Sequence, residues 1–162
     1  MRLFRHLFAR SAHRLFPQAS LERIAQTIAA NELRHRGELC FAVDAALPWA
    51  ALRAGMTARN RAERVFAELR VWDTEENNGV LIHLLLADRR IEIVADRGLS
   101  MVSAEQWRGV CLAMEERLAA GEPEAAVLRG VAAAGDLLAA HFPRIEGVAD
   151  RNELPDLPRI LD

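Results

Sequence analysis

The segment WDTEENNGVLIHLLLADRRIEIVADRG, residues 72–98, carries the clearest indication of the fold. Residues 79–87 are apolar almost throughout, which is typical of a central strand that is covered on both faces. The DRR link at 88–90 is too short for a crossover, so residues 91–96 are expected to pair antiparallel with this strand. The same segment carries six acidic side chains. These raise the question of a metal site, a catalytic site or ordinary polar loops.

The flanking segments indicate an α/β protein. Residues 38–47 alternate in the manner of a strand, and a helix with an apolar inner face is expected after Thr57 as its N-cap. A strand, a helix and a strand in this order form a right-handed parallel crossover, so the predicted sheet is mixed. Two further helices are expected to start at Ser103 and near Pro123. The fold class is therefore α/β, a three-layer α/β/α sandwich with a small mixed sheet.

Three parts are predicted along the chain. Residues 1–16 form an amphipathic helix with a Leu/Phe stripe on one side and Arg and His on the other. The second part, 17–143, is the α/β/α domain, whose first helix is capped by Ser20, and residues 144–162 are an extended tail packed on the domain. The stripe of 1–16 either covers the domain or makes a peripheral contact with an anionic membrane surface.

Charge is distributed unevenly along the 162 residues, although the formal net charge is only −2. Residues 1–36 carry seven Arg and two Glu, whereas the remainder carries fourteen Arg and twenty-one acids. This balance argues against a general nucleic-acid binder. The basic N-terminus lacks an uninterrupted apolar core, and the longest strongly apolar stretch, 79–87, is far shorter than the ~20 residues of a membrane span. We expect no signal peptide, no transmembrane segment and a cytoplasmic location.

A run of oxygen donors precedes the central strand: Asp73, Glu75, Glu76, Asn77 and Asn78. The EF-hand loop pattern does not fit when Asp73 is its first position, because Asn78 then falls at the glycine position and Leu84 at the position of the bidentate Glu. The alternative is an acidic loop in which Asn78-Gly79 supplies a left-handed turn.

Acidic residues should gather at both ends of the sheet. Because the antiparallel strand runs back toward the start of 79–87, Asp96 is expected at the same end as Asp73, whereas Asp44 and Asp88 are expected at the other. A plainer interpretation is that Asp88 and Asp96 cap turns and pair with Arg89, Arg90 or Arg97. The predicted metal ligands are Asp73, Glu75, Glu76, Asn77, Asn78 and Asp96.

Other polar residues favour structural roles. His83 interrupts the apolar strand and is expected to be hydrogen-bonded at a sheet face. Glu32, His35 and Glu38 cluster at a helix-to-strand turn, with metal binding as the lesser alternative. Neither cysteine begins a phosphate-cradling loop, since Arg117 follows Cys111 at the right spacing but across a helical run without Gly.

Four segments together resemble the TPM phosphatase-type domain: HRGELCFAVD (35–44), residues 61–99, WRGVCLAME (107–115) and NELPD (152–156). The resemblance covers about residues 17–161 and implies an α/β/α fold. It also implies weak acid phosphatase activity and binding of Ca²⁺ or Mg²⁺ at the acidic loops, which correspond to Asp73–Asn78 and Asp96. The chain departs from the common bacterial pattern, with Ala95-Asp96 in place of a Gly-x-Gly turn and Ser100 in place of a Glu.

Two functions follow from these observations. The first is a divalent-cation-binding interaction module linked to membrane-protein or envelope maintenance, with a LemA-type membrane protein as the partner that family analogy implies. The second is metal-assisted hydrolysis of phosphomonoesters, for which no catalytic residue is assigned.

Overall fold

The computed structural model describes residues 2–7, 9 and 11–161. Its helices and strands follow one another in the order α1 (Arg2–Leu7), α2 (Ala12–Leu15), α3 (Gln18–Glu32), β1 (Glu38–Asp44), α4 (Trp49–Arg53), α5 (Ala58–Glu68), β2 (Gly79–Leu85), β3 (Arg90–Ala95), the 3₁₀ turn η1 (Arg97–Leu99), α6 (Ala104–Ala119), α7 (Pro123–His141) and β4 (Arg159–Leu161).

The sheet has four strands in the order β3-β2-β1-β4. β1 and β2 are parallel, with Phe41 opposite Ile82, and β2 and β3 are antiparallel, with Ile82 opposite Ile93. The parallel crossover and the antiparallel neighbour are therefore confirmed. The tail also contributes, because β4 pairs parallel with the end of β1.

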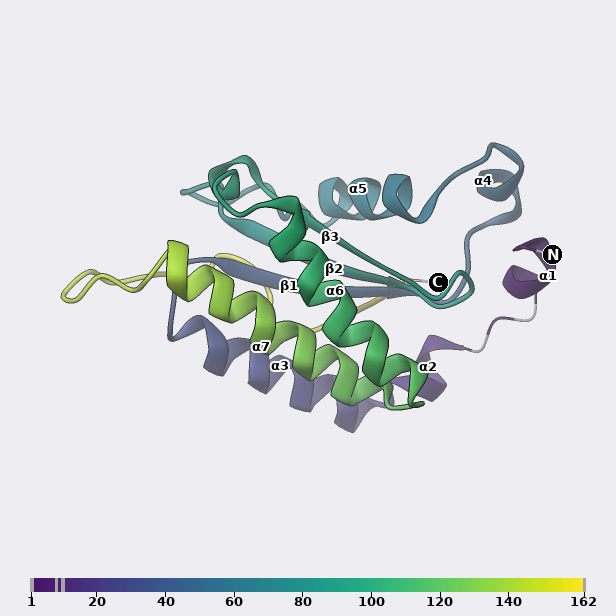
Figure 1. The fold of residues 1–162 in the computed structure, drawn as a ribbon, viewed down its shortest axis with the longest axis horizontal. Coiled ribbons are helices and arrows are strands. Elements are labelled where there is room, and N and C mark those ends of the chain that lie inside the picture. Colours follow the sequence, from purple (N-terminus) through teal and green to yellow (C-terminus); the bar gives the residue numbers. More distant parts are fainter. Residues whose placement is uncertain (1, 8, 10, 162) are drawn as a thin grey trace.

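Helices cover both faces of this sheet (Figure 1). Leu39, Phe41 and Val43 of β1 pack in the larger core with α3, α6 and α7. Cys40 and Ala42 point to the opposite face and pack in a second core with α5. Because successive side chains of a strand alternate between faces, the apolar run of β1 serves both layers. The three-layer α/β/α sandwich is confirmed.

Helix boundaries follow the expected capping chemistry in the second half of the fold. Thr57 caps α5 in a capping box with Asn60, and Ser103 caps α6 in the same way with Gln106. Pro123 occupies the first turn of α7. Gly121, with φ +79°, ends α6 in the left-handed conformation that glycine adopts readily.

The N-terminal prediction of one helix over 1–16 is wrong, since the structure has the two short helices α1 and α2. Positions 8 and 10 lie outside the described residues. His6, expected on the polar face, is only 7% exposed, whereas Phe4, expected on the apolar face, is 64% exposed. The reason is that polar contacts of α1 with the β2–β3 turn, described below, orient this helix.

Three smaller differences concern element boundaries. Ser20 does not cap α3, which begins at Gln18 after Pro17, and the Ser20 side chain is buried. Helix α4 and strand β4 are too short to carry a periodic pattern, so neither is predicted from the sequence.

In the part of the chain that the structure describes, no helix is long and apolar enough to cross a membrane.

Candidate functional site

The predicted donors lie at the end of the sheet where β2 begins and β3 ends. The loop between α5 and β2 contacts the chain after β3, because Gly98 N–H donates to the Asn77 carbonyl at 2.8 Å. Asp96 N–H donates to the Gly79 carbonyl at 2.9 Å. The prediction that the loop 73–78 and Asp96 share one end is therefore confirmed. We call this region the acidic end.

The left-handed residue of the loop is Asn77, with φ +53°, and not Asn78 or Gly79 as expected. Asn tolerates this conformation better than most residues with side chains. Its side-chain oxygen accepts a hydrogen bond from Arg97 Nε at 3.1 Å. Gly98 packs closely against the turn, since a Cβ there would collide with the carbonyl oxygens of Glu76 and Asn77. Close packing of their backbones thus holds loop 73–78 and η1 together.

Two carboxylates of the loop have basic neighbours, and the backbone of a third acidic residue contacts the tail. Asp73 forms an ion pair with Arg70 at 2.6 Å, and Glu76 pairs with Arg36. Glu75 contributes its backbone N–H, which donates to Glu153 of the tail at 3.0 Å. These side chains are exposed or half-buried, so their ion pairs contribute about 0–1 kcal/mol each.

Two buried oxygens at this end have no hydrogen-bond partner among the described residues. One is Oδ1 of Asn78, a residue that is only 2% exposed; its Nδ2 donates to the Arg36 carbonyl at 2.6 Å. The other is Oδ2 of Asp96, whose Oδ1 accepts from Arg97 N–H at 2.7 Å. A buried oxygen without a partner costs about 1–3 kcal/mol, so both atoms have unused capacity to accept a donor or a cation.

A polar cavity of about 610 Å³ is lined by residues of both the loop and the tail. Its wall contains five acids and three arginines in addition to Asn78. The charged lining residues are Asp73, Glu75, Glu76, Asp150, Glu153, Arg36, Arg144 and Arg151.

The donor chemistry of the acidic end suits a hard cation, because Ca²⁺ takes carboxylate, amide and backbone oxygens and Mg²⁺ takes carboxylates and water. Within the described residues, however, no group of three or more His, Cys, Asp or Glu side chains is positioned to hold a metal. Asp73 and Glu76 would have to exchange Arg70 and Arg36 for a cation. A site here therefore depends on the amide and backbone oxygens and on rearrangement of exposed ion pairs.

Asp44 lies at the other end of the sheet, as expected. His83 Nε2 contacts Asp44 Oδ2 at 2.8 Å, and Arg61 donates to both carboxylate oxygens at 2.8 and 3.2 Å. Burial alone would raise the pKa of Asp44, but the hydrogen bonds from His83 and Arg61 lower it on balance. The hydrogen-bonded role of His83 is confirmed. The hydrogen bonds from Arg61 to Asp44 are not predicted from the sequence, because the sequence does not show that Arg61 on α5 faces β1.

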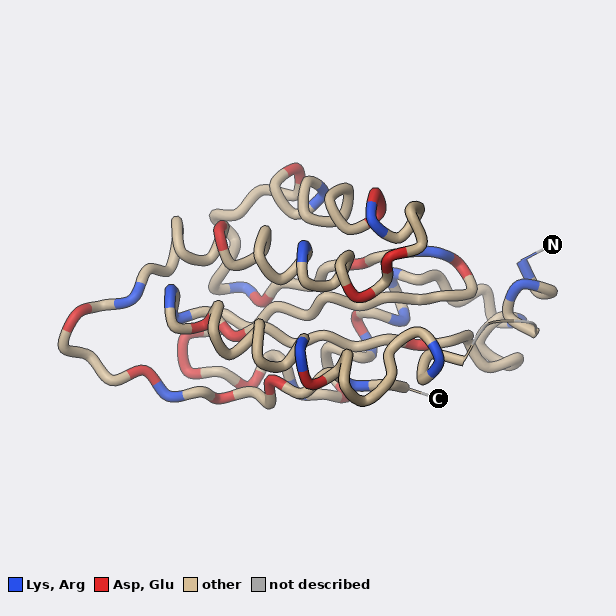
Figure 2. The backbone as a smooth tube through the Cα atoms, turned by 90° about the horizontal axis from the view of Figure 1, so that it is seen from below, with Lys and Arg blue, Asp and Glu red and all other residues tan. Residues whose placement is uncertain are grey.

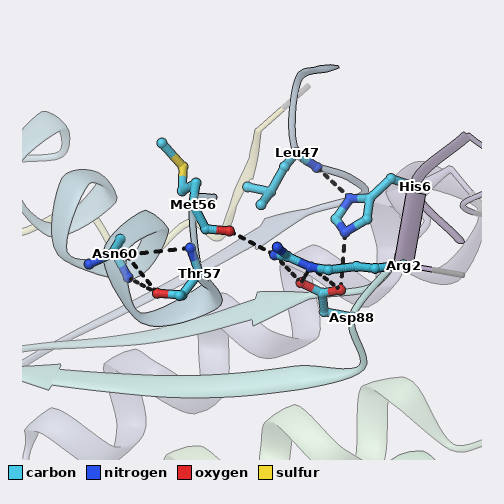
Figure 3. A network of polar contacts seen from close by, with 7 residues as sticks. All are labelled: Arg2, His6, Leu47, Met56, Thr57, Asn60 and Asp88. Atoms are coloured by element: carbon cyan, nitrogen blue, oxygen red, sulfur yellow. Dashed lines mark hydrogen bonds and ion pairs between the residues drawn. The ribbon is translucent and has the colours of Figure 1, made fainter. Parts of the chain in front are cut away.

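Asp88 binds the N-terminal helix instead of the neighbouring arginines (Figure 3). Arg2 Nη2 donates to Asp88 at 2.7 Å, and His6 Nε2 contacts the same carboxylate at 3.1 Å. Leu47 N–H donates to His6 Nδ1 at 2.9 Å. Burial opposes ionisation of Asp88, yet the hydrogen bonds from Arg2 and His6 lower its pKa overall. The alternative interpretation, in which Asp88 pairs with Arg89 or Arg90, is therefore wrong.

The polar cluster at the turn before β1 consists of Glu32, His35 and Glu38. Its two glutamates accept hydrogen bonds from backbone N–H groups. Leu39 N–H donates to Glu32 Oε1 at 2.8 Å, and Leu154 N–H donates to Glu38 Oε2 at 3.0 Å. Burial raises the pKa of Glu32 to about 9 and that of Glu38 to about 7. Burial lowers the pKa of His35 to about 4. These groups connect the turn and the tail.

The chain is thus a three-layer α/β/α domain with an acidic loop at the start of its central strand. Residues 11–137 match the family model of the TPM domain, and the chain belongs to this family. Among solved structures it is similar to the BA42 protein from the psychrophilic bacterium Bizionia argentinensis, determined by NMR. The two are 25% identical with a TM-score of 0.74, over 88% of this chain and 92% of BA42. No curated protein matches the chain.

Proposed function

We propose that the chain is a divalent-cation-binding interaction module, with Ca²⁺ or Mg²⁺ held at the acidic end by Asp73, Glu75, Glu76, Asn77, Asn78 and Asp96. The observation that carries the proposal is the unpartnered Oδ1 of Asn78, a residue buried beside the polar cavity and within a run of carboxylates. An amide oxygen in this position supplies a neutral ligand, and the adjacent carboxylates supply charge.

The ion pairs of the loop do not prevent this binding. Arg70 and Asp73 are both more than half exposed, so their separation costs at most about 1 kcal/mol. A cation must still displace two arginines and reorganise the loop, and this requirement weakens binding. We therefore expect an affinity in the range of extracellular calcium modules, with a Kd on the order of 10⁻⁴–10⁻³ M.

A cation at this position would act on the surface of the cavity. The loop 73–78 contacts η1 through Gly98 and contacts the tail through Glu153, so ordering the loop also orders the cavity wall. That wall, with its mixed charges, is the surface proposed to engage a protein partner. Family analogy suggests a LemA-type membrane protein and a role in membrane-protein or envelope maintenance.

Calorimetric titration with CaCl₂ and with MgCl₂ tests cation binding. Asp96→Asn removes one charge and keeps an oxygen that can cap Arg97, so it should lower Ca²⁺ affinity at least several-fold without unfolding the protein. The matched control is Glu116→Gln, an exposed acid on α6, which should bind as the wild type does. Equal affinity in all three proteins would exclude Asp96 from the site.

A second function, metal-assisted hydrolysis of phosphomonoesters, is favoured by one observation. Arg36, Arg144 and Arg151 line the same cavity as the acidic loop and could bind phosphate oxygens. This function predicts turnover of an aryl phosphate that disappears in both Asp73→Ala and Asp96→Ala. Activity that persists in both variants would assign the turnover to a contaminant, and the cation-binding interaction module would be the remaining function.

A further inference from the structure

The end of the molecule opposite the acidic end exposes large apolar side chains. Helices α1 and α4 and the β2–β3 turn lie there, far from the loop that precedes β2 (Figure 1). Phe4 and Leu7 on α1 are 64% and 63% exposed, and Trp49 on α4 is 52% exposed. Phe4 and Leu7 are three positions apart and so lie on one side of their helix. We call this region, formed by α1, α4 and residues 86–90, the basic end.

Specific bonds hold these exposed groups in place. Arg2 connects α1 with both Asp88 and the carbonyl of Met56 (2.8 Å), and His6 connects α1 with Leu47, immediately before α4 (Figure 3). Helix α1 is thus bound to the β2–β3 turn and to both flanks of α4. The exposure of Phe4 and Leu7 follows from this attachment, because the buried side of α1 is the polar side.

Arginines surround the apolar groups. Arg5, Arg53, Arg89 and Arg90 are all exposed, and within the described residues none of the four takes part in an ion pair. The carboxylate of Asp88 is already balanced by Arg2. Figure 2 shows basic positions (blue) close to the N-terminus. The basic end is therefore cationic where the acidic end is anionic.

A shallow groove of about 980 Å³ runs beside α1 toward the α6–α7 turn. Leu15, Leu84, Leu86 and Leu118 contribute its apolar part, and Arg5 and Arg89 contribute its positive charge. Its acidic residue, Glu115, has Arg108 at 3.5 Å as a partner. An apolar groove beside cations suits a ligand with hydrocarbon next to anionic groups.

We propose that the basic end docks on the surface of an anionic phospholipid bilayer. Phe4 and Leu7 enter the boundary between headgroups and acyl chains, and the arginines bind lipid phosphates. This orientation directs the acidic end away from the membrane, toward solvent and a partner. The proposal is independent of cation binding, since it involves none of the residues at the acidic end.

Co-sedimentation of the full chain with vesicles in EDTA tests the proposal. The protein should pellet with vesicles of phosphatidylcholine and phosphatidylglycerol and remain in the supernatant with pure phosphatidylcholine. Phe4→Ser/Leu7→Ser should abolish pelleting. The control Leu33→Ser/Leu112→Ser removes two exposed leucines elsewhere (72% and 51% exposed) and should pellet as the wild type does.

The charge contribution needs its own pair of variants. Arg89→Gln/Arg90→Gln should weaken binding about fivefold per arginine, which corresponds to the usual contribution of one basic residue at an anionic surface. Arg64→Gln/Arg129→Gln is the matched control on exposed helix positions. The proposal is overturned if the wild type stays in the supernatant, if it pellets equally with neutral vesicles, or if test and control variants behave alike. Capture of an acidic protein without vesicle binding would assign the surface to a protein partner instead.

Discussion

Asp44 adds a polar contact between α5 and the centre of the sheet to the apolar packing described above. Its carboxylate is buried and receives hydrogen bonds from Arg61 of α5 and His83 of β2. A buried charge pair of this kind is weak evidence for net stabilisation, but loss of one partner leaves the others uncompensated. The effect of removing the carboxylate is therefore expected to exceed that of removing an exposed one.

Asp44→Ala should reduce the free energy of unfolding by about 3 kcal/mol or more, measured by urea denaturation near neutral pH. Asp73→Ala, which removes the partner of exposed Arg70, is the matched control and should change stability by less than about 1 kcal/mol. Equal effects in the two variants would contradict the structural role of Asp44.

Glu32 makes stability depend on pH. Its pKa rises from 4.5 to about 9 in the folded protein, chiefly because it is buried. Between these values the folded state binds more protons than the unfolded state, so Glu32 lowers stability as pH rises. Its contribution is most favourable below pH 4.5 and declines until about pH 9.

Glu32→Gln keeps an oxygen for Leu39 N–H and cannot ionise, so it should remove this decline. Urea denaturation at pH 5 and pH 8 should show a smaller loss of stability in the variant, by up to roughly 1.4 kcal/mol per pH unit. The remaining slope is assigned partly to Glu38, whose pKa is about 7. Glu116→Gln should retain the wild-type slope, and a Glu32→Gln variant with that same slope would refute the assignment.

At the residue scale, the sequence predicts which polar groups matter better than it predicts their partners. A histidine in an apolar strand must find a hydrogen bond, so the role of His83 follows from burial. That Asp44 is the partner of His83 depends on the register of β1 against β2, which places Ala42 opposite His83. Likewise, Asp88 pairs with Arg2 and His6 across more than eighty positions, a contact that no local pattern contains.

The loop before β2 and the turn after β3 behave as one element at the scale of secondary structure. Gly98 allows the two backbones to approach, and its N–H donates to Asn77. This contact fixes how far Asp96 lies from the oxygen donors of the loop. Any side chain at position 98 should therefore displace the candidate cation site.

Gly98→Ala should lower stability by about 1–3 kcal/mol and weaken Ca²⁺ binding, because its Cβ would collide with the carbonyl oxygens of Glu76 and Asn77. Gly109→Ala is the control, since a Cβ at this position in α6 meets nothing within 4 Å. That variant should be more stable by roughly 0.5–1 kcal/mol, as expected for Ala in a helix interior. Thermal denaturation and calorimetry would detect both effects, and unaltered Ca²⁺ affinity in Gly98→Ala would contradict the coupling.

At the element scale, long periodic segments are predictable and short ones are not. Helices α5, α6 and α7 and strands β1, β2 and β3 carry enough apolar positions to define their faces. Strand β4 has three residues and depends on the exposed edge of β1 for its pairing. The pattern in 1–16 is helical, but the bonds of Arg2 and His6 to Asp88 reverse which side of α1 is buried.

The whole molecule has two chemically different ends. The excess of arginine in residues 1–36 contributes to the basic end, although Arg53, Arg89 and Arg90 come from later segments. The acidic end combines the loop before β2, the residue after β3 and the tail. Membership of the TPM domain family agrees with the fold. Under the two proposals made above, the basic end approaches a membrane and the acidic end binds a cation and a partner.

The most direct test of the cation site is a Ca²⁺ titration of the ¹⁵N-labelled protein, followed through its backbone amide signals. If the acidic end binds the cation, saturable shifts should be concentrated in residues 73–79 and 96–98, with a Kd on the order of 10⁻⁴–10⁻³ M. Amides of α1 and the β2–β3 turn should stay unchanged and serve as the internal reference. If residues 73–79 and 96–98 do not move up to millimolar Ca²⁺, or move no more than the reference, the acidic end is not a cation site.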